Sequence, residues 1–283
     1  MYEPKYPPTL NESSVSLSNL RFGILHKAEY VNPDAPETDP LHIHNAVEIF
    51  WNVSSDVSFL VNNNLYRVPI GDAVVSRPND VHMAVFQRAT VHKYVCIWID
   101  ADWQSPVFSF LQAADFCPLF SFDEKTEKKL QELIFSLLTA CDTGGSELEK
   151  VCDLLQILQL LKKSQPQQHT QGGIPAALQE ILDDIHANPA RIRSVNDLLQ
   201  THFVSSSTLT RWFRTYIHSS PREYLESVRL SNALTLLQSG ASVTDACMRA
   251  GFSDCSHFIS LFKKKFGETP FRYKKSRRQT PPS

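Results

Sequence analysis

Residues 242–266, SVTDACMRAGFSDCSHFISLFKKKF, decide the fold of the C-terminal third, because they read as two short helices joined by a tight turn. Ser242 is a preferred N-cap residue for the first helix, and Gly251 supplies the turn that ends it. Ser253 is the expected N-cap of the second helix. The apolar residues of that second helix recur at helical spacing on one face: Phe258, Leu261, Phe262 and Phe266. The stretch predicts a helix-turn-helix unit.

The same design stands 48 residues earlier, in residues 194–216, SVNDLLQTHFVSSSTLTRWFRTY. Ser194 and Ser205 are the expected N-caps of its two helices. The second helix again has an apolar face, formed by Leu209, Trp212, Phe213 and Tyr216. The match of SVND to SVTD therefore indicates an internal duplication.

One uninterrupted helix joins the two units, beginning at Pro221 and ending at Gly240. It would be about 28 Å long at 1.5 Å per residue. The outward helices of the two units could then lie roughly 34 Å apart, which is one turn of B-DNA. Residues 174–283 are thus predicted to form an all-α DNA-binding domain with helix-turn-helix motifs at about 194–216 and 242–266.

Charge is unevenly distributed along the chain, although the formal net charge is only −2. From residue 174 onward, 15 Lys and Arg stand against 9 Asp and Glu. The preceding residues carry a surplus of acids. A basic C-terminal part is suited to a polyanionic partner, and double-stranded DNA fits the helical pattern.

The first 122 residues have a different character, with short segments rich in β-branched and aromatic residues. VEIFWNV, VSFLVNN, DAVVSRP and VHKYVCIWID are separated by polar turn sequences. Strands spaced about ten residues apart indicate a sandwich or a small barrel. The predicted fold class is therefore α+β with two domains, an N-terminal β-barrel followed by an all-α domain.

Two amphipathic helices are expected between these parts, within residues 123–163. Their apolar stripes are wider than one intramolecular partner need cover, which favours a homodimer interface; the competing interpretation is that both helices pack only on the barrel. Residues 164–173 are polar, lack periodicity and read as a linker.

The helical third resembles the AraC/XylS family of bacterial transcription regulators over about 100 residues. The resemblance is carried by SSSTLTRWFRTYIHSSPREYLESVRLSNALTLL and by AGFSDCSHFISLFKKKFGETPFRYKK. It implies a double helix-turn-helix in which outward positions read bases. In this sequence those positions are Ser207, Thr210, Arg211, Cys255, Ser256 and His257.

Two residues depart from the family pattern: Leu199, where a small residue is usual, and Ser260, where the second recognition helix usually carries Arg. Arg211 can make a bidentate pair with guanine, which Ser260 cannot do. Three further basic residues complete the predicted DNA-binding set, namely Arg214, Lys263 and Lys264; the two lysines are expected to contact phosphate.

Residues 40–99 resemble the cupin-like barrel that regulators of this family often carry. HIHNAVE is similar to the first cupin motif, and GDAVVSRPNDVH to the second, which would bring His82 beside the first motif. In a strand, His42, His44 and Glu48 would share one face because their separations are even. The four side chains could hold a divalent metal or hydrogen-bond a small effector, with Phe50 and Trp98 as apolar walls.

The predicted function is sequence-specific regulation of transcription in response to a small-molecule effector bound in the barrel. A metal-dependent cupin enzyme, of dioxygenase or isomerase type, is the alternative from another class. No catalytic residues are assigned, no cofactor is required, and a divalent metal is an option. RNA polymerase is a further candidate partner. The chain shows no secretory signal and no apolar run near the ~20 residues of a membrane span, so a cytoplasmic protein is expected.

Overall fold

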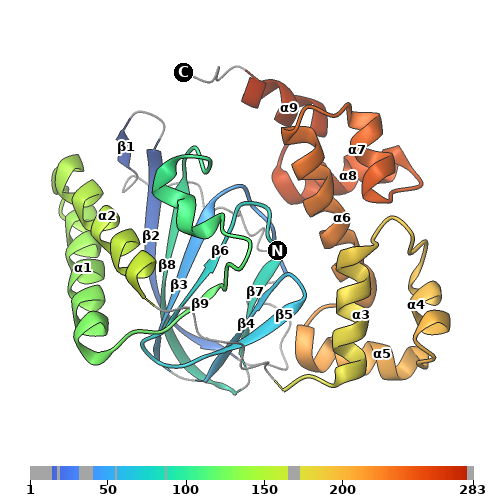
Figure 1. The fold of residues 1–283 in the computed structure, drawn as a ribbon, viewed down its shortest axis with the longest axis horizontal. Coiled ribbons are helices and arrows are strands. Elements are labelled where there is room, and N and C mark those ends of the chain that lie inside the picture. Colours follow the sequence, from blue (N-terminus) through green and yellow to red (C-terminus); the bar gives the residue numbers. More distant parts are fainter. Residues whose placement is uncertain are drawn as a thin grey trace.

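The computed structural model places an N-terminal region of β-sheets with two helices beside a C-terminal region that is entirely helical (Figure 1). This arrangement confirms the predicted α+β fold class. The structure describes residues 15–17, 20–31, 41–54, 56–86, 88–164 and 173–278. Most of the predicted linker, residues 165–172, lies outside these ranges.

In the part of the chain that the structure describes, nine strands form two antiparallel sheets. The larger sheet has the strand order β1 (Val15–Leu17), β2 (Leu20–Val31), β8 (Thr90–Asp100), β3 (Val47–Ser54), β6 (Ala73–Ser76) and β9 (Leu119–Phe120). The smaller sheet has the order β5 (Asn64–Val68), β4 (Val57–Val61) and β7 (His82–Phe86). Within the described residues the two sheets face each other as an open barrel, and no backbone ladder closes them into a continuous one.

Strand β3 shows how the alternation of side chains divides this region into two cores. Phe50 points between the two sheets, where it joins a cluster with Phe59 and Tyr94. Ile49 and Trp51 point to the opposite side of the larger sheet, into a second cluster. Because successive residues of a strand point to opposite faces, one strand serves both cores.

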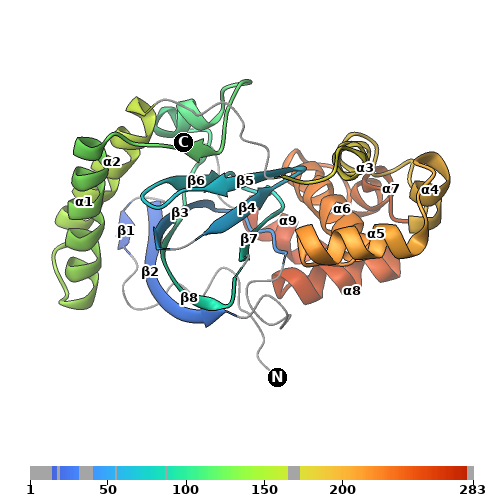
Figure 2. The same ribbon diagram turned by 90° about the horizontal axis from the view of Figure 1, so that it is seen from below.

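Helices α1 (Glu124–Asp142) and α2 (Glu147–Lys163) cover the outer face of the larger sheet (Figure 2). Most of their predicted apolar stripes are buried against that sheet and against each other, including Leu133 and Leu158. The sheet therefore covers more of these stripes than the sequence led us to expect. Leu155 remains 43% exposed, and Leu148, two helical turns earlier, is 72% exposed.

Seven α-helices within residues 173–278 form the C-terminal region. They are α3 (Ala176–Ala187), α4 (Val195–Thr201), α5 (Ser206–Trp212), α6 (Pro221–Gln238), α7 (Val243–Ala250), α8 (Cys255–Phe266) and α9 (Pro270–Arg278). A π-helical turn, Phe213–Ile217, follows α5, and a short 3-10 helix, Pro106–Leu111, precedes β9 in the N-terminal region. Both predicted helix-turn-helix units are present, α4–α5 and α7–α8, and α6 connects them.

Three of the expected helix caps are confirmed and one is wrong. Ser194, Ser205 and Ser242 stand at the N-caps of α4, α5 and α7. The N-cap of α8 is Asp254, whose carboxylate accepts a hydrogen bond from the backbone N–H of Ser256 at 2.7 Å, and not the neighbouring serine expected from the sequence. An ionised carboxylate makes a stronger bond to a helix N-terminus than a hydroxyl does, and the helix begins one residue later.

Gly251 ends α7 as predicted, and a side chain would not fit there. Its φ of 98° lies in the left-handed region, and a Cβ would stand 2.6 Å from Cα of Ala190. The glycine therefore lets the turn of the second unit pack closely against the loop that follows α3.

Candidate functional site

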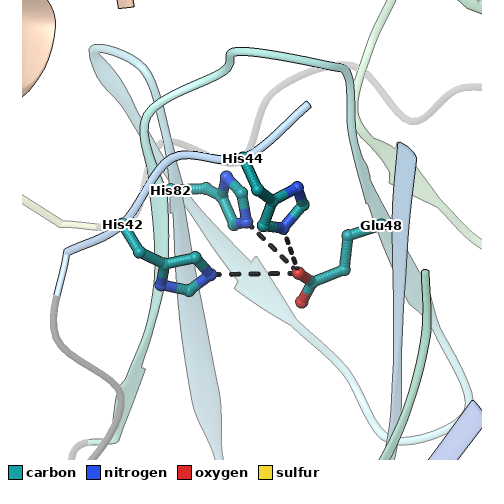
Figure 3. Close-up of side chains that lie close together, drawn as sticks. All are labelled: His42, His44, Glu48 and His82. Carbon is teal, nitrogen blue, oxygen red and sulfur yellow. Dashed lines mark hydrogen bonds and ion pairs between the residues drawn. The ribbon is translucent and has the colours of Figure 1, made fainter. Parts of the chain in front are cut away.

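Four buried side chains converge inside the barrel-like region: His42, His44, Glu48 and His82 (Figure 3). Each is between 0% and 8% exposed, and one ligand atom from each lies within 4.8 Å of the others. This cluster is called the His–Glu centre below. Charged side chains are almost never buried unless they are paired, so such a cluster points to a specific role.

Different elements supply these residues, and the local structure differs from the expected strand. Glu48 lies on β3, and His82 is the first residue of β7. His42 and His44 lie on the segment before β3, where His42 forms an isolated bridge with His82. Even spacing along one strand is therefore not what unites the set. Backbone hydrogen bonds in both directions between His42 and His82, each 3.1 Å long, bring the two motifs together.

One oxygen of Glu48 is the focus of the centre. Oε2 accepts hydrogen bonds from His44 Nε2 at 2.8 Å, from His82 Nε2 at 3.3 Å and from Trp98 Nε1 at 2.7 Å. His42 Nε2 lies 3.8 Å from the same oxygen. The role of Trp98 as a donor was not predicted from the sequence, which indicated only an apolar wall; its position follows from the pairing of Glu48 with Trp98 across β3 and β8.

Protonation differs among the members of the centre. Burial alone would raise the pKa of Glu48, but the three surrounding histidines outweigh it and hold this pKa well below its usual range. Burial lowers the pKa of His44 to about 4, so His44 is neutral. Burial would also lower the pKa of His82, but the Glu48 carboxylate outweighs it and the pKa is raised. The buried carboxylate thus faces a neutral His44 and a His82 whose pKa is shifted toward the charged form.

The donor set fits a divalent transition-metal ion. Three imidazoles and one carboxylate are the ligands that Zn, Mn and Fe accept in proteins. A hydrogen bond outside the centre fixes the orientation of the His82 ring. Its Nδ1 donates to the carbonyl oxygen of Asp80 at 2.8 Å, which leaves Nε2 facing the centre. Such outer hydrogen bonds are typical of histidine ligands. Asp80 is a supporting residue that the sequence did not indicate.

Phe50 lies beside the centre in a packed aromatic cluster. Its ring centroid is 4.9 Å from that of Phe59 and 5.0 Å from that of Tyr94, and Phe59 in turn stacks on His82 at 6.1 Å. These rings exclude water from one side of the His–Glu centre. They strengthen the electrostatic interactions within it, since the local dielectric is low.

The helical region exposes the residues that were predicted to contact DNA. On α5 and the π-helical turn, Ser207, Thr210, Arg211 and Arg214 are exposed. On α8, Ser256, His257, Lys263 and Lys264 are exposed, whereas Cys255 is half-buried and its thiol interacts with that of Cys247. In both units, the buried aromatic face of the helix directs the remaining side chains outward.

One contact on α8 was not predicted. His257 Nε2 donates to Oε1 of Glu226, on α6, at 3.2 Å, and the same oxygen accepts from Arg222 at 3.0 Å. His257 is therefore tied to the connecting helix, while it remains exposed enough to reach a ligand. No sequence pattern could have found this pair, because 31 residues separate the two partners.

Comparisons with known proteins agree with this arrangement. Residues 198–276 match a protein family described as a helix-turn-helix domain. The chain is 28% identical to the HTH-type transcriptional activator RhaR of Mannheimia succiniciproducens, over 88% of this chain and 95% of the relative. It is 35% identical to the activator RhaS of Escherichia coli over 41% and 42% of the two chains, respectively.

Among solved structures, ToxT from Vibrio cholerae is similar with a TM-score of 0.36 and 12% identity, covering 91% of this chain and 98% of ToxT. The duplicated helix-turn-helix units and the relatives define a DNA-binding transcription regulator. The helical part of the chain resembles the AraC/XylS family of these regulators. Within the described residues, no helix is long and apolar enough to cross a membrane.

Proposed function

We propose that the two outward helices, α5 and α8, read double-stranded DNA in successive major grooves. The connecting helix α6 has 18 residues and so spans about 27 Å, which suits the spacing of one B-DNA turn. The observation that carries the proposal is the exposure of the polar side chains of both helices above two buried aromatic faces. Because its target is chromosomal DNA, we place the protein in the cytoplasm.

DNA binding is tested by selecting fragments from a random duplex pool with the purified full-length protein. Enrichment of one sequence pattern, bound much more tightly than random duplex, supports the proposal. Binding that is equal on all sequences contradicts it, since phosphate contacts alone carry no sequence information. Several relatives are named activators, which supports RNA polymerase as a further partner.

We also propose that the effector sensed by the barrel-like region is a divalent transition-metal ion held by the His–Glu centre. The convergence of four buried ligand atoms within 4.8 Å supports this assignment. When bound, the ion would supply a fixed positive charge at the centre. His82 would bind the ion as a neutral imidazole, because a protonated one cannot be a ligand. We infer no enzymatic activity, because gene regulation accounts for both regions.

Metal binding is tested by elemental analysis of the purified protein and by Zn²⁺ titration of the metal-free form. Glu48→Gln should weaken Zn²⁺ binding strongly, while Gln104→Glu, on an exposed loop, is the matched control and should not. Equal Zn²⁺ binding by Glu48→Gln and wild type would contradict the assignment. Tight metal binding together with no sequence-specific DNA binding would favour the metal-dependent enzyme instead.

We propose further that the protein forms a homodimer through the outer face of α2. Leu148 and Leu155 are exposed on one side of this helix, and exposed Cys152 lies between them. Sedimentation of the Leu148→Glu/Leu155→Glu variant tests the proposal, because neither side chain belongs to the core. A dimer that becomes a monomer supports it. An unchanged sedimentation coefficient, or a wild-type monomer at micromolar concentration, contradicts it.

A further inference from the structure

The two segments that carry the histidines of the His–Glu centre also contact the helical region. His42 follows Leu41, whose carbonyl oxygen accepts a hydrogen bond from Nζ of Lys265, on α8, at 3.1 Å. His44 precedes Asn45, whose side-chain oxygen accepts from Nε2 of Gln238 at 2.6 Å. Each of these contacts is made by the immediate neighbour of a histidine. The centre and the helical region therefore share one stretch of backbone.

Gln238, the last residue of α6, joins both segments. Its Nε2 donates to Asn45, and its Oε1 accepts from Nδ2 of Asn79 at 2.8 Å. The backbone N–H of Asn79 in turn donates to the carbonyl oxygen of His44 at 2.9 Å. Asn79 also accepts a hydrogen bond from the hydroxyl of Ser231, on α6, at 2.7 Å. One glutamine side chain thus holds the loop before His82 and the segment of His44 in a fixed relation.

Side chains on the opposite side of these segments complete the contact. Leu41 and Ile43 alternate with His42 and His44 and belong to the same buried cluster as residues of the helical region. Val81 and Met83 flank His82 in the same way and belong to that cluster too. The histidines thus face the centre while their neighbours face the helices. A shift of the histidine backbone would therefore move the apolar surface on which the helices pack.

The second helix-turn-helix unit, and helix α3, which precedes the first unit, contact the barrel-like region at different places. Lys265 belongs to the second unit and contacts Leu41. On the side of the first unit, Nε2 of Gln179, on α3, donates to the carbonyl oxygen of Asn63 at 2.8 Å. Asn63 lies in the turn between β4 and β5, where the neighbouring Asn62, and not Asn63, bonds to Val81 of a histidine-bearing segment. The second unit is thus the one that contacts the backbone of the centre.

We propose that metal occupancy of the His–Glu centre is coupled to DNA binding through these two segments, and that Gln238 is the residue that transmits the coupling. This inference rests on the proposed function. A metal ion would fix the positions of His42, His44 and His82 and so favour one arrangement of the segments. DNA would favour one placement of the second unit relative to the first. Gln238 links the arrangement of the segments to the placement of the second unit, because it bonds to both segments from the end of α6.

The test compares two alanine substitutions of glutamine at the same interface. Gln238→Ala removes the hydrogen bonds to both histidine-bearing segments, and Gln179→Ala removes a hydrogen bond to the β4–β5 turn, which belongs to neither segment. Gln238 is exposed at a helix end, so alanine preserves the helix. Asn79 is unsuitable for substitution, because its φ of 71° is one that asparagine tolerates better than alanine. For each full-length protein, two affinities are measured. The affinity for the selected DNA is measured in the presence and in the absence of Zn²⁺, and the affinity for Zn²⁺ is measured in the presence and in the absence of that DNA.

In the wild type, Zn²⁺ should change the DNA dissociation constant at least about fivefold, and DNA should change the Zn²⁺ affinity by the same factor. In Gln238→Ala this factor should fall below about twofold, while Zn²⁺ binding without DNA is retained. Gln179→Ala should keep the wild-type factor.

The outcomes separate this inference from the proposed function. A wild-type protein that binds no Zn²⁺, or binds Zn²⁺ and DNA independently, overturns the proposed metal response and this inference with it. A coupled wild type with an equally coupled Gln238→Ala overturns the inference alone. Equal loss of coupling in both glutamine variants also overturns it, because the interface as a whole would then transmit the signal and Gln238 would have no special role.

Discussion

The two helix-turn-helix units are built alike but are held differently by the rest of the chain. In both, an N-cap and a buried aromatic face direct polar side chains outward. Helix α5 presents the exposed guanidinium of Arg211. Helix α8 has no arginine; His257 bonds to the connecting helix, and Lys265 bonds to the barrel-like region. A duplicated fold therefore does not imply a duplicated role.

The difference suggests a division of work between the two units. The first unit has the side chain best suited to read a base, since arginine can bond two acceptors of guanine at once. The second unit has exposed Lys263 and Lys264, which suit phosphate, and Lys265, which makes the direct contact with a histidine-bearing segment. We therefore expect sequence discrimination to come mainly from α5, and general affinity and response to the effector mainly from α8.

The largest expected effect that would test this division is that of Arg211→Ala. Loss of a base contact should cost about 1–3 kcal/mol on the selected DNA and much less on random duplex. Fluorescence anisotropy on both DNAs measures the difference. Arg67→Ala, an exposed arginine of the barrel-like region, is the matched control and should change neither affinity. Equal losses on both DNAs would place Arg211 among the phosphate contacts and break the comparison.

The contact of α3 and α6 with the barrel-like region, on the side of the first unit, should depend on pH through His186, on α3. Its Nε2 lies 3.0 Å from the hydroxyl of Tyr224, which donates to the carbonyl oxygen of Asn62 in the barrel-like region. Burial lowers the pKa of His186 to about 4. The unfolded state therefore binds more protons between this value and the ordinary pKa. The free energy of unfolding is therefore undiminished by His186 above pH 6.5, and it decreases as the pH falls from 6.5 toward 4.

At pH 5, His186 should thus cost on the order of 1–2 kcal/mol of unfolding free energy relative to pH 7. Urea unfolding of the metal-free protein at both pH values measures this loss, and His186→Gln should show a smaller one. His44, whose pKa is also lowered to about 4, contributes in the same direction in both proteins. An identical pH dependence in the two proteins would show that His186 is not held neutral by the fold.

The caps of the two recognition helices allow a direct comparison of the units. Asp254→Ala removes the carboxylate that caps α8, and Ser205→Ala removes the hydroxyl that caps α5. Each should destabilise the protein by about 1 kcal/mol, with the larger loss at Asp254 because a charged acceptor bonds more strongly. Urea unfolding at pH 7 measures both. A larger loss for Ser205→Ala would contradict the assignment of Asp254 as the stronger cap.

The smallest expected effect is that of Lys264→Ala on the second unit. Loss of one phosphate contact should weaken binding to every sequence alike and reduce the slope of log affinity against log salt by about 0.9. Titrations at several salt concentrations, on selected and random DNA, measure both quantities. A loss confined to the selected DNA would instead make Lys264 a base-reading residue, and α8 would then share the role assigned to α5.

Local patterns in the sequence predicted most of the fold. The duplicated pattern predicted both helix-turn-helix units, and serine caps marked the starts of α4, α5 and α7. The π-helical turn after α5 was not predictable, because the apolar spacing there fits an ordinary helix equally well. The choice of Asp254 over Ser253 as a cap depends on one residue of register, which propensity does not fix.

The four residues of the His–Glu centre were found from motif resemblance, although the expected strand geometry for His42 and His44 was wrong. What holds them is long-range: the His42–His82 bridge and the pairing of Glu48 with Trp98. The contact of Gln238 with Asn45 joins residues 193 positions apart. Such polar pairs leave no periodic trace in a sequence, so they appear only once the chain is folded.

The most direct test of the central claim is a methylation-interference footprint of the full-length protein on its selected DNA. Two recognition helices joined by α6 should give two major-groove patches on one face of the duplex, about 10 base pairs apart for each protomer. Arg211→Ala should abolish interference at a guanine in one patch and leave the other patch unchanged. A single patch per protomer, or interference that Arg211→Ala does not alter, would contradict the proposal that both helices enter the DNA and that α5 reads its sequence.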